Sequence, residues 1–156
     1  MKTDRHKKGI TAIELLVVIA VLSIIFSVAL PRFSKIRENQ VLKDAVSDVL
    51  SSLNKAQSQT LASVNSSSYG VHFQSDKVII FKGKVFSASD ANNETISITT
   101  PASISNVTLT GVSGNSGDVY FSRLSGVPSK TGTVTVSTSS FSKVITISAT
   151  GSASMN

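Results

Sequence analysis

The 156-residue sequence contains no cysteine and only two histidines, and both scarcities exclude kinds of site. Without cysteine the chain forms no disulfide and offers no thiolate to a metal, and it carries no information on redox compartment. His6 lies among the first nine residues, and His72 has no second histidine at metal-ligand spacing beside it. The sequence therefore predicts no metal centre and no cofactor.

Motifs of enzyme chemistry are also lacking. Serine is abundant, but no Gly-x-Ser-x-Gly elbow occurs, and the acidic residues do not alternate as in a calcium-binding loop. Gly111, Gly114 and Gly117 form neither a dinucleotide fingerprint nor a phosphate-binding loop, and we interpret this stretch as a mobile loop. We expect a protein that is not an enzyme.

Charge is sparse and unevenly placed. The formal net charge is +6, and Lys2, Arg5, Lys7 and Lys8 against Asp4 place half of this excess within residues 1–9. The length supports one modest domain plus an anchor.

A long apolar run follows these basic residues. Residues 15–30 are all apolar except Ser23 and Ser27, and Glu14 is the one charged residue within 10–30. As a helix, residues 10–30 would be about 30 Å long, enough to cross a bilayer's hydrocarbon core. The basic residues before them favour a cytoplasmic N-terminus. We expect a single-pass membrane protein with its remaining chain outside the cytoplasm.

The order of basic leader, glycine, Thr-x-x-Glu, unbroken apolar run and proline resembles the signal of type IV prepilins and type II secretion pseudopilins. The resemblance implies that a prepilin peptidase and N-methyltransferase cuts after Gly9 and methylates Ile10. It also implies an anchor that stays in the lipid of the bacterial cytoplasmic membrane and later packs against other pilin or pseudopilin subunits. The family's glutamate corresponds to Glu14 and its helix-kinking proline to Pro31. Ala12 and Ile10 depart from commoner residues but remain apolar.

Two roles for Glu14 follow. Thr11 and Glu14 fit a capping box, and a carboxylate near a helix start also suits the helix dipole. Cleavage after Gly9 would in addition free the amine of Ile10 in the same apolar layer. That amine could neutralise Glu14 of a neighbouring subunit and set the register between helices, because an unpaired buried charge is costly.

Two simpler interpretations of the N-terminus remain open. An ordinary secretory signal peptide would be cut near Ser27-Val28-Ala29, but it gains nothing from a carboxylate at position 14. An uncleaved signal anchor explains the length of the run but neither Gly9 nor Glu14.

Beyond Pro31 apolar residues recur at helical spacing, which predicts an amphipathic helix over about 32–62. Turn-forming residues 63–68 should end it. The predicted apolar stripe consists of Phe33, Ile36, Leu42, Val46, Val49, Leu53, Ala56 and Leu61.

From residue 69 the pattern changes to alternation, which predicts strands. The expected strands are residues 69–73, 77–82, 95–99, 107–110, 118–122, 133–137 and 143–148, with hairpin connections at 74–76 and 138–142. One antiparallel sheet with an apolar face and a wet face, covered by the helix, gives an α+β fold. The predicted divisions are a leader (1–9), an assembly helix (10–31), an amphipathic helix (32–64) and a β-rich head (65–156), which is the pilin fold.

The C-terminal part, with Val119-Tyr120-Phe121-Ser122, a glycine, a polar hairpin and Gly151, resembles GspH/FimT-like minor pilins and pseudopilins. Some such proteins bind DNA. The head's side chains sum to only +2 over residues 65–156, so a solvated sheet edge is the simpler interpretation. The candidate nucleic-acid contacts are Lys82, Lys84, Arg123 and Lys130.

The expected function is therefore a structural subunit of a type IV pilus, most closely a minor pilin. A type II secretion pseudopilin is the alternative within the class. A DNA-capture minor pilin at a pilus tip and a signal-anchored surface adhesin are the competitors from other classes.

Overall fold

The chain begins with one long helix, α1, which spans Ala12–Leu61. The computed structural model describes residues 9–155, except for the side chains of Leu30 and Pro31. Thr11 caps the helix, because its Oγ1 accepts a hydrogen bond from the Glu14 N–H at 3.3 Å and its carbonyl accepts one from the Leu15 N–H at 3.2 Å. These bonds satisfy donors without a partner inside the helix. The Thr11 half of the predicted capping box is confirmed, whereas no hydrogen bond from the Thr11 N–H to the Glu14 carboxylate is found among the described residues.

α1 continues without interruption through Pro31. A proline inside a helix removes one backbone donor and clashes with the preceding turn, which is why the sequence predicts a kink near residues 27–31. The side chain of Pro31 lies outside the described part of the chain, so the kink stays a prediction. The chain divides into two compact units, Met1–Ile36 and Arg37–Asn156, and each is described by itself.

In the second unit, one face of α1 is buried. Five residues of the predicted stripe are at most 2% exposed: Leu42, Val46, Val49, Leu53 and Ala56. Their spacing of three or four residues places them on one side of the helix. Phe33, Ile36 and Leu61 were predicted in the same stripe, but they are 69%, 66% and 46% exposed. The prediction was wrong for these three because Phe33 and Ile36 precede the unit that holds the strands, and Leu61 ends the helix.

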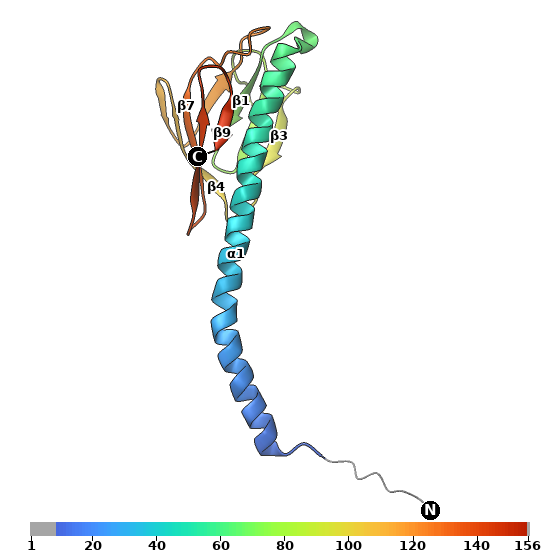
Figure 1. Cartoon of the computed structure of the whole chain (residues 1–156). Helices are drawn as coiled ribbons and strands as arrows, with labels where there is room; N and C mark the ends of the chain where they lie inside the picture. Colours follow the sequence, from blue (N-terminus) through green and yellow to red (C-terminus); the bar gives the residue numbers. More distant parts are fainter. Residues whose placement is uncertain (1–8, 156) are drawn as a thin grey trace, which may run out of the picture. The chain divides into compact units, whose positions relative to one another are not determined.

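The strands form two antiparallel sheets, shown in Figure 1. A short 3₁₀ turn, Val64–Ser66, links α1 to the first of them. The first sheet has the order β3-β2-β1-β6, with β1 Tyr69–Phe73, β2 Lys77–Lys82, β3 Glu94–Ser97 and β6 Gly117–Tyr120. The second has the order β5-β4-β7-β8-β9, with β4 Ser103–Leu109, β5 Val112–Gly114, β7 Gly132–Ser137, β8 Ser142–Ile147 and β9 Ala153–Met155.

The α+β class and all seven expected strands are confirmed, with shifts at several ends. The expectation of a single sheet was wrong, and so was that of a mobile loop around Gly111, Gly114 and Gly117. Gly111, at φ +79°, makes the turn from β4 to β5, Gly114 ends β5, and Gly117 begins β6. The sequence missed β5 and β9 because three residues are too few to show alternation.

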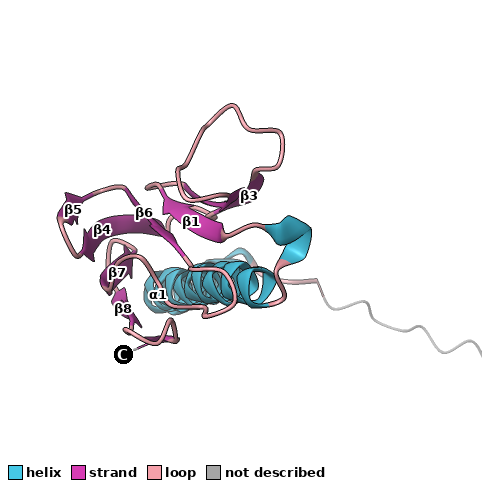
Figure 2. Ribbon diagram, turned by 90° about the horizontal axis from the view of Figure 1, so that it is seen from above, coloured by secondary structure: helices cyan, strands magenta, loops and turns pink. Residues whose placement is uncertain are grey.

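The core lies between α1 and the inner faces of both sheets, and Figure 2 shows α1 beside β1, β7 and β8. In β7 and β8, Val134, Val136, Ile145 and Ile147 are at most 1% exposed, while the residues between them are half-buried. This alternation is the period of a strand with one face inward. Both sheets and the helix therefore contribute to one hydrophobic core.

The outer face of the first sheet is also covered, contrary to the expectation of a wet face. Phe81 is 1% exposed and Ile79 is 7% exposed. The ring of Phe81 lies over Gly70, where an added Cβ would come within 2.4 Å of its Cζ. Phe86, from the loop after β2, meets Phe81 edge-on with ring centroids 5.6 Å apart. The sequence pattern of β2, Val-Ile-Ile-Phe, is that of a strand buried on both faces.

Candidate functional site

The cleavage position predicted from the leader is open to solvent. Gly9 is exposed, with no heavy atom within 4 Å of where a Cβ would be, and Ile10 is 78% exposed. The leader residues before Gly9 lie outside the described part of the chain. A peptidase could reach the Gly9–Ile10 bond without displacing any described element.

Glu14 lies in the first turn of α1, four residues after Ile10. Its side chain is exposed and takes part in none of the ion pairs found within residues 9–155. Its backbone N–H donates to Thr11 Oγ1, so the helix cap uses the main chain of residue 14. The carboxylate of Glu14 takes no part in the cap. The carboxylate is available to a cation from outside the described chain.

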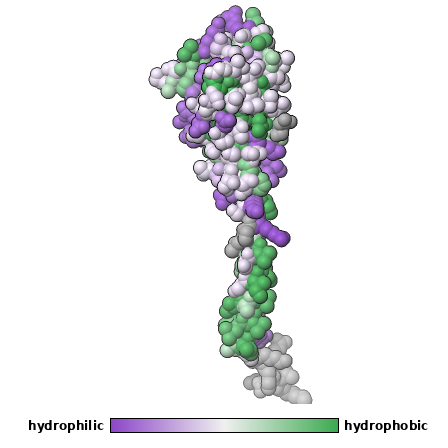
Figure 3. All heavy atoms as spheres, turned by 90° about the vertical axis from the view of Figure 1, so that its left-hand side faces the viewer, coloured by the Kyte–Doolittle hydropathy of each residue, from purple (hydrophilic) through white to green (hydrophobic). Residues whose placement is uncertain are grey.

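The helix around Glu14 is apolar on all sides. None of its membrane-length apolar stretch is buried within the protein, and by length and composition it is able to cross a bilayer. Figure 3 shows this part of α1 as an almost continuous hydrophobic surface. The exposed aliphatic and aromatic side chains include Leu15, Leu16, Val17, Ile19, Leu22, Ile24, Ile25, Phe26 and Val28. Ser23 does not interrupt this character, because its hydroxyl donates to the Ile19 carbonyl at 2.8 Å.

A shallow depression runs along the end of this surface, all of it within the first unit. Aliphatic side chains line it, together with the ring of Phe33 and the side chain of Arg32. The remaining residues that line it are Ile24, Ile25, Val28, Ala29 and Ile36.

His72 is the titratable group with the most structured surroundings in the head. Its ring stacks on Phe86 at 3.9 Å between centroids and 6° between planes. Gln74 Nε2 lies 3.3 Å from His72 Nε2. This contact is a hydrogen bond from the Gln74 amide when the ring hydrogen lies on Nδ1. Nδ1 faces Asp118 Oδ1 at 4.0 Å and makes no hydrogen bond.

Burial lowers the pKa of His72, and the Asp118 carboxylate opposes this in part. The imidazole is therefore neutral and packed between an aromatic ring and an amide. No group of three or more histidine, aspartate or glutamate side chains able to hold a metal occurs among the residues that the structure describes.

The four candidate nucleic-acid contacts all come from one end of the head, which we call the distal end. It is the end where α1 terminates, because Gly83 N–H donates to the Ser68 carbonyl at 2.7 Å and Arg123 Nη1 donates to the Ser66 carbonyl at 2.8 Å. Lys82 and Lys84 flank Gly83, and Lys130 belongs to the same β6–β7 connection as Arg123. We call Lys82, Lys84, Arg123 and Lys130 the distal cations.

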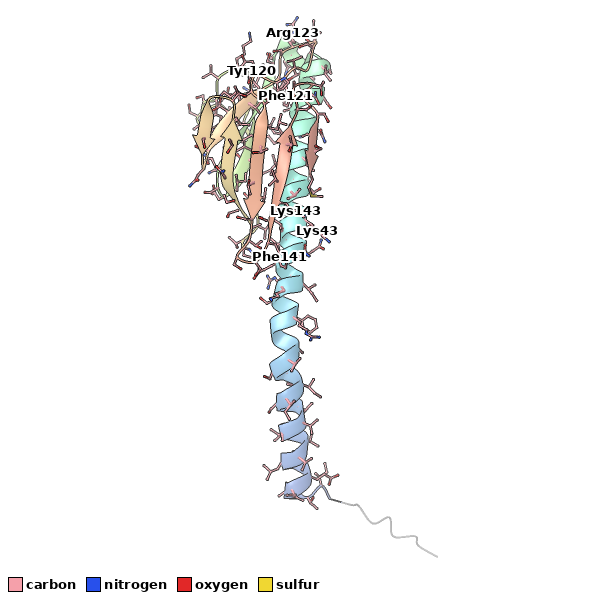
Figure 4. The ribbon with its side chains drawn as sticks, turned by 60° about the vertical axis from the view of Figure 1, so that its left-hand side comes forward. Lys43, Tyr120, Phe121, Arg123, Phe141 and Lys143 are labelled. Carbon is pink, nitrogen blue, oxygen red and sulfur yellow. The ribbon has the colours of Figure 1, made fainter. Side chains whose placement is uncertain are left out.

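One of these cations has a hydrogen-bond partner, and a second lies near a carboxylate. The guanidinium of Arg123, labelled in Figure 4, holds the 3₁₀ turn in place. The pKa of Asp90 is lowered, first by hydrogen bonds from the Asn92 backbone and side chain and then by the charge of Lys82. Lys82 thus faces a carboxylate. The four residues lie at the distal end of the head, but they do not form a dense basic patch.

The residues that fasten α1 to the strands were not predicted from the sequence. Thr60 is fully buried, and its Oγ1 accepts a hydrogen bond from the Tyr69 N–H at 2.9 Å. Gln57 Nε2 donates to the carbonyls of Gly126 and Thr150 at 3.2 and 3.3 Å. Polar residues in a helical pattern gave no signal of this, since each partner is more than eight residues distant in the sequence.

No family model, no curated protein and no solved structure matches this chain.

Proposed function

We propose that the chain is a pilin-like structural subunit, a minor pilin of a type IV pilus, with a type II secretion pseudopilin as the alternative. The observation that carries this proposal is an apolar, exposed stretch of α1 with one carboxylate that forms no ion pair within residues 9–155, joined to a unit with its own core. The head needs no further partner to bury its apolar residues, whereas the stretch before it does.

Two environments can bury the apolar surface of such a helix, one before assembly and one after it. Apolar surface gains roughly 25 cal/mol per Å² on leaving water, so the stretch belongs in lipid or against other helices. In lipid its polar side chain Ser23 is satisfied within the helix. In a helix bundle made of copies or relatives of this chain, the same surface is buried by neighbouring stretches.

In the helix bundle, Glu14 sets the axial register between neighbouring helices. Aliphatic helices slide past one another at little cost, because their side chains are interchangeable. The amine freed at Ile10 and the carboxylate of a neighbouring Glu14 would meet at one axial offset only. Leaving either charge unpaired in a dry bundle costs about 3–5 kcal/mol.

The test is to change Glu14 and follow the protein through insertion, cleavage and assembly. Glu14→Gln should still be inserted and cleaved, because insertion depends on the apolar run and cleavage on the residues around Gly9. Its amount in sheared filaments should fall strongly. Ser23→Ala is the matched control in the same stretch, and it should assemble normally because the Ser23 hydroxyl is already satisfied. Equal amounts of Glu14→Gln and wild type in filaments would show that the Glu14 carboxylate does not set the register, and this part of the proposal would fall.

The mature N-terminus separates this proposal from the two simpler interpretations. Mass spectrometry should find N-methylated Ile10 at the start of the protein. A start at Leu30 would identify an ordinary secretory signal. An intact leader would identify an uncleaved anchor.

DNA capture is a second candidate, supported by the placement of the distal cations at the end of the head where α1 terminates. The carboxylate of Asp90 near Lys82 and the hydrogen bond from Arg123 to the Ser66 carbonyl limit what these two cations offer to phosphates. We therefore rank it below the structural role.

A further inference from the structure

Basic residues follow the apolar run as closely as they precede it. Arg32, Lys35, Arg37 and Lys43 lie within thirteen residues after Leu30. Lysine and arginine beside a membrane span normally mark the cytoplasmic side, so a cluster at the opposite end is not explained by orientation. An anionic partner on that side would account for it.

The head adds to this cluster from a distant part of the chain. Figure 4 places Lys43 of α1 and Phe141 and Lys143 of the β7–β8 hairpin at the same end of the head, opposite the distal end. Phe141 is a large aromatic side chain at a hairpin tip, and it is 36% exposed. We call Lys43, Phe141 and Lys143 the proximal face.

The hairpin is held firmly against α1. Ser139 Oγ donates to Glu38 Oε2 at 3.1 Å. Within the turn, the Thr138 N–H donates to the Phe141 carbonyl at 2.8 Å, and the Phe141 N–H donates to Thr138 Oγ1 at 3.2 Å. The tip that carries Phe141 is therefore fixed at the level of residue 38 of the helix.

Nearby acidic groups are already engaged. Glu38 accepts the Ser139 hydroxyl, and Asp44 accepts a hydrogen bond from Gln40 Nε2 at 2.9 Å. Neither forms an ion pair within the described residues 9–155. The two lysines of the proximal face thus keep their charge for an outside partner.

Few residues separate the apolar run from the part of α1 that the hairpin contacts. Glu38 follows Leu30 by eight residues, so the chain allows the head to approach the bilayer surface closely. The polar layer of a bilayer extends roughly 5–8 Å beyond its hydrocarbon core. Lysine side chains can reach into this layer, and an aromatic ring is stable there between apolar and wet surroundings.

We propose that the proximal face rests on anionic phospholipid headgroups of the membrane that holds the apolar stretch. This inference depends on the membrane anchoring in the proposed function and adds to it a defined posture of the head before assembly. Lys43 and Lys143 bind phosphate groups, and the Phe141 ring enters the headgroup layer. Extraction of a subunit into a filament then breaks these contacts.

The chain contains no tryptophan, so Phe141→Trp introduces a single fluorophore at the hairpin tip. The full chain with this change is reconstituted in vesicles of phosphatidylcholine, with or without phosphatidylglycerol, and with brominated acyl chains as quencher. With phosphatidylglycerol present, emission should shift to the blue and be quenched. Val127→Trp, at an exposed position in the β6–β7 connection at the distal end, should show neither effect.

Charge reversal tests the lysines. Lys43→Glu with Lys143→Glu, added to Phe141→Trp, should abolish the quenching that depends on phosphatidylglycerol. Lys82→Glu with Lys130→Glu, which changes the net charge equally at the distal end, should leave it intact. Equal quenching at positions 141 and 127, equal quenching in both lipids, or no effect of the proximal reversal would each overturn the proposal.

Vesicle flotation separates this proposal from the one on which it rests. A chain that floats but shows no quenching at position 141 refutes the resting posture alone, whereas a chain that does not float refutes the anchor. Since the chain also lacks cysteine, Ser140→Cys with a nitroxide label gives an independent readout in case Phe141→Trp disturbs the turn. Its accessibility to lipid-soluble oxygen should rise in vesicles that contain phosphatidylglycerol.

Discussion

The bond between Thr60 and Tyr69 offers a sharp test of how α1 is fastened to the first sheet. Thr60 is 0% exposed, and its Oγ1 donates to the Ala56 carbonyl at 2.8 Å while it accepts the Tyr69 N–H at 2.9 Å. Thr60→Val keeps the branched shape but removes the acceptor. Tyr69, at 8% exposure, would then hold a buried N–H without a partner.

An unsatisfied buried donor costs about 1–3 kcal/mol. For a unit the size of the head, each kcal/mol lowers the melting temperature by roughly 3–6 °C, so Thr60→Val should lower it by about 3–18 °C. Thr60→Ser keeps the acceptor and loses one methyl group, at a cost of about 1 kcal/mol. The order of stability should be wild type, then Thr60→Ser, then Thr60→Val.

The assay is thermal unfolding of the full chain in mild detergent, followed by circular dichroism at a wavelength where strands contribute. Thr95→Val is the matched control, because Thr95 is exposed on β3, and its melting temperature should stay close to that of wild type. If Thr60→Val is as stable as Thr60→Ser, the hydroxyl does not hold the helix end, and our account of the α1–β1 junction is wrong.

Three further outcomes are expected. Removal of residues 1–36 should leave a soluble folded domain with the far-UV circular dichroism of an α+β protein, and a disordered spectrum would refute a self-sufficient core. Binding of the head to DNA should be weak, non-specific and lost at high salt, because its excess charge is small, and charge reversal at Lys82 with Lys84 should reduce it; nanomolar affinity at physiological salt would contradict this account. Because the pKa of His72 is lowered in the folded state, the unfolded chain binds more protons, so stability should fall as the pH drops through about 6.5. Between about pH 7.5 and about pH 5.5, the urea midpoint of His72→Gln should change less than that of wild type. An equal change in both would show that other groups cause the pH dependence of stability.

The sequence predicted those features that depend on local pattern. The cap at Thr11, the buried positions from Leu42 to Ala56 and all seven long strands follow from residue spacing, and the structure confirms them. Assembly of strands into two sheets depends instead on contacts between distant residues, such as Gly70 with Tyr120. Pattern alone carries no information on such pairs, so the single sheet was wrong.

The candidate site shows the same division. Gly9, Ile10 and Glu14 are recognisable because they stand in one short stretch, and the structure leaves all three exposed. The proximal face was not foreseen, because Lys43 and Lys143 are brought to one end of the head only by the pairing of β7 with β8. Phe141 was predicted to lie in the hairpin connection 138–142, but the sequence does not show which end of the head that hairpin occupies.

The pairing of β6 with β1 has a consequence for how the protein is made. β1 obtains its second neighbour only from Gly117–Tyr120, and the buried face of α1 is covered in part by β7 and β8, which come later still. A chain that emerges from its N-terminal end, during synthesis or during the export that we propose, therefore exposes an unpaired strand edge and an apolar helix face until most of its length is available. Such surfaces pair with other chains. Partly emerged chains should thus aggregate more readily than the modest size of the head would suggest.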